Sequence, residues 1–193
     1  MKLFGKMLLT TILGAGLAYA APYKLDNSHT EVGFSVKHLM ISNVKGKFKD
    51  FGATIDFDAK TNTFKTFEAT VDAKTIDTAN VKRDDHLKSA DFFYAEKFPT
   101  ITFKMKSYKA DDDDEGVMIG DLTMRGVTKE VKLEVEDLAK GKGFKGENRV
   151  GFSLEGKVNR MDYGLKWNKA LEFGGVAVGE EVKLLIEVEA IEQ

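Results

Sequence analysis

Three histidines are the side chains of this sequence best suited to hold a metal ion or to move a proton, since the chain contains no cysteine. They are His29, His38 and His86. No two of them stand three or four residues apart, the spacing that puts two ligands on one face of a helix, and no H-E-x-x-H sequence occurs. We therefore expect no metal site and no cofactor, unless the fold brings the histidines together in space.

Nucleophilic catalysis has little support in the sequence. A serine hydrolase would need Ser28 or Ser35 to meet a histidine and a carboxylate in space, and there is no G-x-S-x-G turn. The acidic run from Asp111 to Glu115 begins like a calcium loop, but Leu122 stands at the twelfth position, where a glutamate is needed. We expect no catalytic residues.

His38 and Arg160 are the polar residues best placed to contact a ligand inside the protein. His38 continues the apolar parity of residues 32–36, and Arg160 continues that of residues 152–158. In a strand this parity points both side chains inward, where a charge is costly unless it is paired or bound to a ligand. We predict that both orient the polar head group of a ligand whose tail is held by apolar walls. The alternative is that the strand ends before Arg160, which leaves its guanidinium in solvent or paired with Asp162.

The segments that must position these residues alternate apolar and polar side chains with a period of two. This pattern is typical of half-buried antiparallel strands. It predicts eight strands, at residues 30–38, 43–58, 64–74, 99–109, 116–125, 127–138, 147–160 and 181–192. The parity changes near Gly52, which predicts a bulge or bend. One short helix is expected within residues 83–90, where the period of two is lost.

An all-β chain of this kind must hide one apolar face, either in a closed barrel or in a sandwich. Residues 44–58 would span roughly 50 Å if they were fully extended, which is long for a sandwich. We therefore predict an extended eight-stranded antiparallel barrel with one short helix and a central lumen. Inward parity predicts that the lumen is lined by Phe34, Val36, Phe67, Val71, Ile101, Phe103, Met118, Leu122, Met124, Leu133 and Phe152.

Residues 1–20 have the organisation of a secretory signal peptide. Lys2 and Lys6 form a basic region before an apolar stretch at residues 7–17, and Ala18-Tyr19-Ala20 forms an A-x-A cleavage site. That stretch is too short for a spanning helix, which needs about 20 apolar residues. The sequence therefore predicts export to the periplasm, one domain at residues 21–193 and no stable membrane insertion. A retained membrane anchor is the alternative.

The charge balance argues against a nucleic-acid partner. The 193 residues include 29 basic and 31 acidic side chains. The chain thus lacks the positive surplus that neutralises phosphates on DNA or RNA. Hydrophobic residues make up 42% of the chain, a share that is ordinary for one soluble globular domain.

Six motifs follow one another along the chain. They are residues 23–29 (YKLDNSH), 34–38 (FSVKH), 44–48 (VKGKF), 83–103 with RDDHL, SADFF and FPTITF, 120–128 (GDLTMRGVT) and 160–165 (RMDYGL). In this order they resemble the YceI-like family of secreted, lipocalin-like, polyisoprenoid-binding proteins. One departure is that Ser28 precedes His29, whereas the family usually places serine after the histidine; Thr30 preserves the hydroxyl.

The resemblance implies a lipocalin-like barrel around a long amphiphilic chain, such as a polyisoprenoid, an isoprenoid quinone or a fatty-acid-derived lipid. It also adds a homodimer as a candidate assembly. Three functions stay open: a periplasmic lipid carrier, a hydrolase or metal-dependent enzyme acting on such lipids, and a structural or stress-response partner whose lumen is filled by its own side chains. The carrier is the predicted function, since burial of ten methylenes supplies roughly 8 kcal/mol without any catalytic group.

Overall fold

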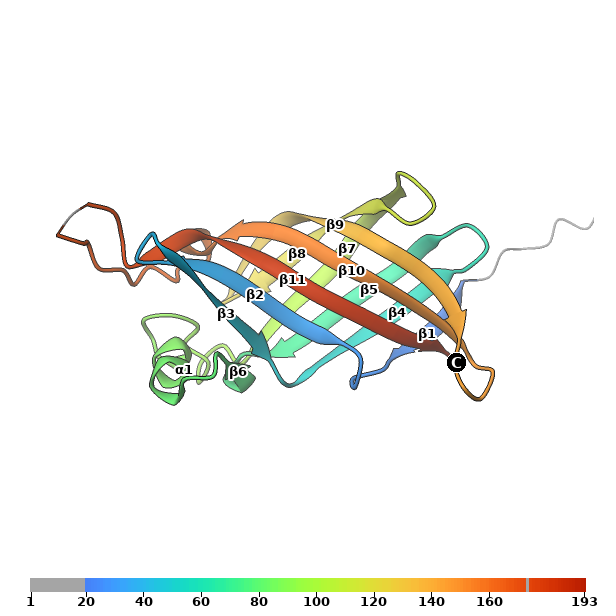
Figure 1. Ribbon diagram of the computed structural model, residues 1–193, viewed down its shortest axis with the longest axis horizontal. Helices are drawn as coiled ribbons and strands as arrows, with labels where there is room; N and C mark the ends of the chain where they lie inside the picture. Colours follow the sequence, from blue (N-terminus) through green and yellow to red (C-terminus); the bar gives the residue numbers. More distant parts are fainter. Residues whose placement is uncertain (1–19, 173) are drawn as a thin grey trace, which may run out of the picture.

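The computed structural model describes residues 20–172 and 174–193. In it the chain forms an elongated antiparallel β-barrel with one α-helix (Figure 1), as predicted. The predicted signal peptide lies outside the described residues, apart from Ala20. The strands are β1 (Ala21–Leu25), β2 (Glu31–His38), β3 (Ser42–Phe48), β4 (Phe51–Asp58), β5 (Thr63–Asp72), β6 (Ile76–Asp77), β7 (Thr100–Ala110), β8 (Gly116–Met124), β9 (Val127–Lys142), β10 (Asn148–Asn159) and β11 (Val178–Glu192).

Eight strands close the barrel, because two of them are interrupted along their length. β1 and β2 together form one barrel strand, and β3 and β4 form the next. The others are β5, β7, β8, β9, β10 and β11, each antiparallel to its neighbour. β11 closes the barrel by pairing with both β1 and β2. The two-residue β6 pairs only with the end of β3.

The predicted bend in the strand at 43–58 is present, but it lies slightly before Gly52. Lys49 and Asp50 leave the sheet there, and both donate their backbone N–H groups to the Thr75 hydroxyl, at 3.2 and 3.0 Å. This hydroxyl replaces a neighbouring strand as hydrogen-bond acceptor. β3 therefore turns away from the course of β4.

Two short elements differ from the prediction. β1 is too short to show a periodic pattern, and its pairing with β4 and β11 defines it as a strand. The helix α1 spans Val81–Lys88, two residues earlier than expected, because the Asn80 side chain caps it by accepting the Arg83 N–H at 3.1 Å. A 3₁₀ turn, η1 (Ala73–Thr75), joins β5 to β6, and a second, η2 (Arg160–Tyr163), follows β10. Among the described residues, no helix has the length and apolar character to cross a membrane.

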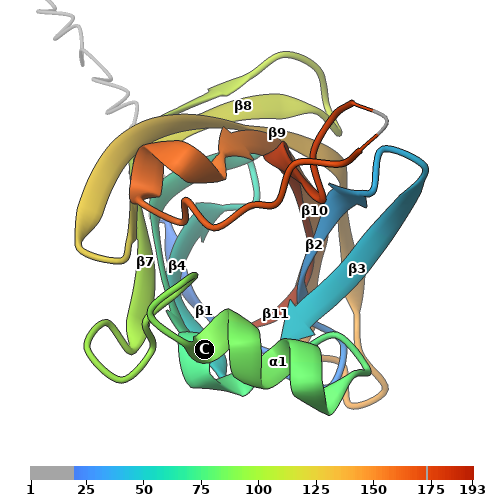
Figure 2. The same cartoon turned by 90° about the vertical axis from the view of Figure 1, so that its left-hand side faces the viewer.

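The two ends of the barrel are built differently. One end, here called the helix end, carries α1, η2, the β2–β3 turn and residues 164–172 and 174–177 around the barrel opening (Figure 2). The opposite end carries the β4–β5, β7–β8 and β9–β10 turns (Figure 1). The interior near these turns is packed solid. Its inward residues, here called the plug, are Tyr23, Ile55, Phe57, Phe64, Tyr108, Met118, Leu133, Val135, Leu138, Val150 and Phe152.

Phe64 is the centre of the plug. Its ring centroid lies 4.9 Å from that of Phe57, 5.0 Å from that of Tyr108 and 4.8 Å from that of Phe152. Only 3% of Phe64 is exposed. Tilted and edge-to-face rings at such distances are in direct packing contact.

Candidate functional site

The half of the barrel at the helix end is hollow. It holds a cavity with a volume of about 180 Å³, counting only the space that the centre of a water molecule can reach. Strands β2, β5, β7, β8 and β11 contribute much of its wall, and most of the lining side chains are aliphatic or aromatic. The cavity ends at Phe67 and Phe103, which line it and whose rings lie 6.1 Å apart. Behind them, Phe67 touches Phe152 of the plug.

The size of the inward side chains explains why one half is hollow and the other is filled. Along β4, Ala53 at the helix-end side precedes Ile55 and Phe57 at the same parity. Ala53 pairs across the sheet with Ala69 of β5, and both line the cavity. Small side chains at these positions leave the interior open, whereas phenylalanine side chains fill it further along the barrel.

Eight of the eleven side chains predicted to line the lumen are in the cavity wall: Phe34, Val36, Phe67, Val71, Ile101, Phe103, Leu122 and Met124. Contact between these residues and a ligand stays a prediction. Met118, Leu133 and Phe152 do not line the cavity, although they point inward as expected, because they belong to the plug. A period of two shows which face a residue occupies but not how deep along the barrel it lies.

Part of the wall comes from segments without periodicity, which sequence reasoning missed. Leu87 of α1, the following Phe92 and Phe93, and Leu165 all line the cavity. They cover the side of the barrel where β3 and β5 have no recorded pairing with each other among the described residues. The motifs noted for their resemblance contain all four residues, Leu87 in RDDHL, Phe92 and Phe93 in SADFF and Leu165 in RMDYGL, but nothing in those motifs placed them in the cavity wall.

Arg160 is the one charged side chain in this wall. It is only 3% exposed, and it is held by backbone carbonyl groups. Its Nε donates to Gly179 O at 2.8 Å, Nη1 donates to Leu165 O and to Trp167 O, the latter at 3.0 Å, and Nη2 donates to Val178 O at 3.2 Å. These bonds hold the guanidinium at the helix end of the cavity.

The charge of Arg160 is not balanced by an ion pair with any carboxylate among the described residues. Burial lowers the pKa of Arg160 from its ordinary value, and the more distant Glu180 opposes this shift. β10 does end at Asn159, as the alternative interpretation supposed, but the guanidinium is neither in solvent nor paired with Asp162. The predicted inward orientation of Arg160 is therefore correct.

His38 does not share this position. It is the last residue of β2, where it lies opposite Ser42 and Val178, and it is half-buried outside the cavity wall. The register of β2 with β3 is unbroken up to the pair His38–Ser42, so His38 keeps the parity of Val36, but the irregularity in β11 between Val178 and Val182 and the end of β2 place it at the rim. His38 therefore lies at the mouth of the barrel and not in the cavity wall with Arg160.

His86 takes part in an aromatic contact at the helix end. Its ring lies 5.0 Å from that of Phe92 and 4.9 Å from that of Trp167, and its Nε2 is 2.9 Å from an oxygen of Asp91. Arg160 lies over the ring of Phe92, with its Cζ 6.0 Å from the ring centroid. These contacts connect α1 to Trp167 across the opening.

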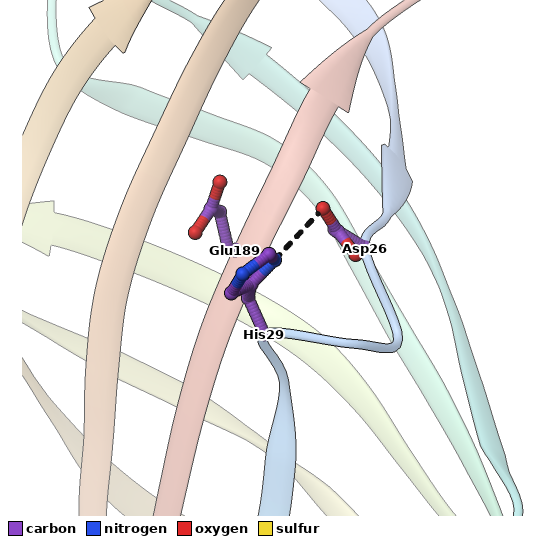
Figure 3. A group of neighbouring side chains, drawn as sticks. All are labelled: Asp26, His29 and Glu189. Carbon is purple, nitrogen blue, oxygen red and sulfur yellow. Dashed lines mark hydrogen bonds and ion pairs between the residues drawn. The ribbon is translucent and has the colours of Figure 1, made fainter. Parts of the chain in front are cut away.

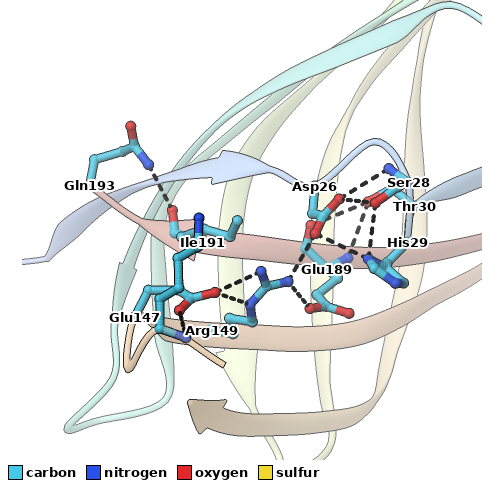
Figure 4. Close-up of polar contacts among 10 residues, drawn as sticks. Asp26, Ser28, His29, Thr30, Glu147, Arg149, Glu189, Ile191 and Gln193 are labelled. Atoms are coloured by element: carbon cyan, nitrogen blue, oxygen red, sulfur yellow. Dashed lines mark hydrogen bonds and ion pairs between the residues drawn. The ribbon is translucent and has the colours of Figure 1, made fainter. Parts of the chain in front are cut away.

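His29 meets two carboxylates on the outside of the barrel, which its spacing in the sequence did not indicate. Ligand atoms of His29, Asp26 and Glu189 all lie within 4.8 Å of one another (Figure 3). Arg149 enters the same group, with Nη1 2.9 Å from Asp26 and 2.5 Å from Glu189 (Figure 4). A divalent cation here would compete with this guanidinium for both carboxylates, so the group is better suited to an ion-pair network than to a metal.

The same turn brings Ser28, His29 and Asp26 together, as a serine hydrolase would require. Both the Ser28 hydroxyl and an Asp26 oxygen lie 3.1 Å from the same ring nitrogen, His29 Nδ1. In a catalytic triad the serine and the carboxylate use opposite nitrogens of the ring. Ser28 also hydrogen-bonds Asp26 directly at 2.5 Å, and none of the three lines the cavity. Hydrogen bonds from Ser28, then His29 and Arg149, hold the pKa of Asp26 well below its usual range.

Comparison with known proteins agrees with this architecture. The YceI-like domain profile matches residues 23–190. Protein YceI of Escherichia coli O17:K52:H18 is 38% identical over the whole of this chain and 98% of its own length. The crystal structure of a YceI protein from Campylobacter jejuni is 43% identical, with a TM-score of 0.73, over 89% of this chain and 98% of that one.

A third likeness concerns the fold alone. A polyisoprenoid-binding domain from Saccharophagus degradans superposes with a TM-score of 0.66 at 13% identity, over 91% of this chain and all of that domain. The extended barrel, its apolar cavity and the match over nearly all of residues 20–193 lead to one conclusion: this chain belongs to the YceI-like family.

Proposed function

We propose that this protein carries one long amphiphilic lipid through the periplasm, with the tail in the cavity and the head group beside Arg160. The observation that supports this most is the pairing of an apolar cavity, stopped at one end by the plug, with a single buried cation near its other end. Such a site is polar at one end only. It suits a ligand that is polar at one end only.

The apolar tail supplies most of the affinity in this proposal. Each methylene that leaves water contributes about 0.8 kcal/mol, before the cost of ordering the chain is subtracted. A polyisoprenoid, an isoprenoid quinone or a fatty-acid-derived chain all meet this requirement. Lipid binding also agrees with the similarity to the polyisoprenoid-binding domain of Saccharophagus degradans.

Arg160 supplies the selection for a head group. Its recorded hydrogen bonds account for four of the five N–H groups of a guanidinium, which leaves one on Nη2 without a partner among the described residues. This N–H and the unbalanced charge favour a head with an acceptor oxygen, such as a quinone carbonyl, a carboxylate or a phosphate.

Carriage is favoured over hydrolysis because no nucleophile and base face the cavity together among the described residues. The cluster of Ser28, His29 and Asp26 lies on the outer surface, and His29 is 62% exposed in its side chain. A lipid in the cavity has no contact with it. The enzyme alternative would therefore need a second binding mode.

Native mass spectrometry before and after organic extraction tests the proposal. We expect the protein purified from a periplasmic fraction to retain one lipid per chain, which extraction removes and an added polyprenol restores. The same spectrum reads the start of the chain, which we propose is Ala21 after export. A protein that carries no lipid and takes up none would contradict the carrier function.

The role of Arg160 is tested by competition between ligands that share a tail and differ in the head. Arg160→Lys keeps a charge but loses the planar fork, so we expect it to reduce the preference for a polyprenyl phosphate over the matching polyprenol. His38→Ala serves as the control, because His38 is outside the cavity wall. Unchanged preference in Arg160→Lys would remove Arg160 from the site.

A further inference from the structure

The turn between β2 and β3 exposes three apolar side chains in succession. Leu39 is 38% exposed, Met40 52% and Ile41 80%, and we call these residues the apolar tip. Among the described residues only five large hydrophobic side chains are this exposed, and four of them, the tip and Val81 of α1, lie at the helix end. Phe144 is the fifth, in the β9–β10 turn at the opposite end.

The backbone of the apolar tip is unusual as well. Ile41 N–H donates to His38 O at 3.1 Å, and the two residues between them have positive φ angles, +49° at Leu39 and +63° at Met40. A tight turn with two positive φ angles favours asparagine and glycine, because a side chain is strained in this region. Here the turn holds two large apolar residues in that conformation and presents them to solvent.

The chain segment that carries the apolar tip is basic. From Val32 to Lys49 the chain has four lysines and no acidic residue. Lys47 and Lys49 pair with Glu31 and Asp77, whereas no ion pair is recorded for Lys37 or Lys45 among the described residues, and both are exposed. An apolar projection flanked by lysines is complementary to an anionic lipid surface, which attracts the charges and accepts the apolar side chains.

The apolar tip also lies next to the opening of the cavity. It begins three residues after Val36, which lines the cavity, and Leu39 N–H donates to Ala177 O at 2.8 Å in the segment that precedes β11. Figure 1 places this turn at the same end as α1 and residues 164–172 and 174–177. Contact between the tip and a membrane would bring the opening of the cavity to the bilayer surface.

We propose that the apolar tip docks the helix end on the anionic surface of a phospholipid bilayer, where the carried lipid is loaded or released. This inference rests on the carrier function for its purpose, but the docking surface itself is a separate physical claim. Ile41 and its neighbours insert among the lipids, and Lys37 and Lys45 contact the head groups.

Vesicle flotation tests the docking surface, using vesicles of phosphatidylethanolamine and phosphatidylglycerol. The protein is purified from a periplasmic fraction and its mass is checked first, because a retained N-terminal segment would itself bind vesicles. Ile41→Asp should weaken binding about tenfold or more. Lys37→Gln and Lys45→Gln should each weaken it about fivefold, and vesicles of phosphatidylcholine alone should bind poorly.

Phe144→Asp is the matched control, since it makes the same kind of change at the opposite end and should leave vesicle binding unchanged. Equal binding by Ile41→Asp and the wild type would overturn the proposal, as would equal losses in Ile41→Asp and Phe144→Asp. A third result would also overturn it: the wild type does not bind vesicles but forms a dimer, and Ile41→Asp dissociates that dimer. In that case a second copy of the chain covers the apolar tip.

Lipid retention by native mass spectrometry separates this proposal from the carrier function. We expect Ile41→Asp to retain lipid as the wild type does, because Ile41 is not in the cavity wall. If no variant retains lipid while vesicle binding still depends on Ile41, the carrier function fails and the docking surface stands.

Discussion

The two halves of this barrel share one sheet and one alternation pattern, yet one half is filled and the other is hollow. At the plug, Phe64 contacts Phe57, Tyr108 and Phe152 through its ring. At the helix end, the corresponding inward positions hold Ala53 and Ala69 as well as larger residues, and a cavity remains. Alternation thus decides which side chains face inward, and their volume decides whether the interior can hold a ligand.

The filled half supports the hollow half. A cavity has no packing contacts across its empty space, so its walls contribute less to stability than an equal area of packed core. The plug and the continuous sheet must therefore hold the barrel together while the helix end remains able to admit a lipid. Substitutions in the two halves should accordingly have different effects.

The largest effect is expected for Phe64→Ala in the plug. Removing this buried ring should lower the free energy of unfolding by about 3–5 kcal/mol, because the surrounding aromatic rings cannot collapse into the space. Phe34→Ala, on the cavity wall, is the comparison, and its cost should be clearly smaller because one side of Phe34 already faces the cavity. Urea denaturation of both variants measures the difference. Equal losses would contradict the division into a packed and a hollow half.

A smaller contrast in the same direction is expected when side chains are enlarged instead of truncated. Leu133→Trp in the plug should cost about 1–3 kcal/mol of stability through overpacking. Leu122→Trp in the cavity wall should leave the free energy of unfolding nearly unchanged and should reduce lipid binding, because the indole occupies space needed by the tail. If Leu122→Trp stays folded by circular dichroism and binds a polyprenol as tightly as the wild type, Leu122 does not face the ligand.

The smallest effect concerns the outer network around Asp26, which belongs to neither interior. The folded protein holds the pKa of Asp26 below its usual range, so the resulting stabilisation is present above the unfolded pKa of about 3.9 and is lost as the pH falls through the lower folded value. Asp26→Asn should therefore lower the melting temperature at neutral pH, and the difference from the wild type should shrink below about pH 4. Lipid retention should not change. A difference that grows on acidification would contradict this assignment.

The sequence predicted the barrel and its inward face well, because a period of two carries that information directly. It also predicted that Arg160 points inward, even though β10 ends one residue earlier. It did not separate Met118 from Met124, which share one face of β8 but lie in different halves. The step from Phe57 to Ala53 in side-chain size was available in the sequence as a guide to that difference.

Other features depend on tertiary contacts that no local pattern encodes. Asp26, Arg149 and Glu189 come from three separate regions and meet only because β1 and β10 both pair with β11. Phe92 and Phe93 reach the cavity from a segment without periodicity. His38 keeps the predicted parity, but it is the last residue of β2 and lies beyond the cavity wall, a depth along the barrel that the pattern does not encode.

Methionine methyl NMR tests most directly whether a lipid tail occupies the hollow half. Met124 lines the cavity, whereas Met118 lies in the plug on the same strand and face, so the two methyl groups form an internal comparison. Their signals can be assigned with Met124→Leu and Met118→Leu, and lipid-free protein can be titrated with geranylgeraniol. We predict contacts between the isoprenoid methyl groups and Met124, with none to Met118. A bound isoprenoid that leaves the Met124 methyl unaffected, or that contacts Met118, would contradict the account.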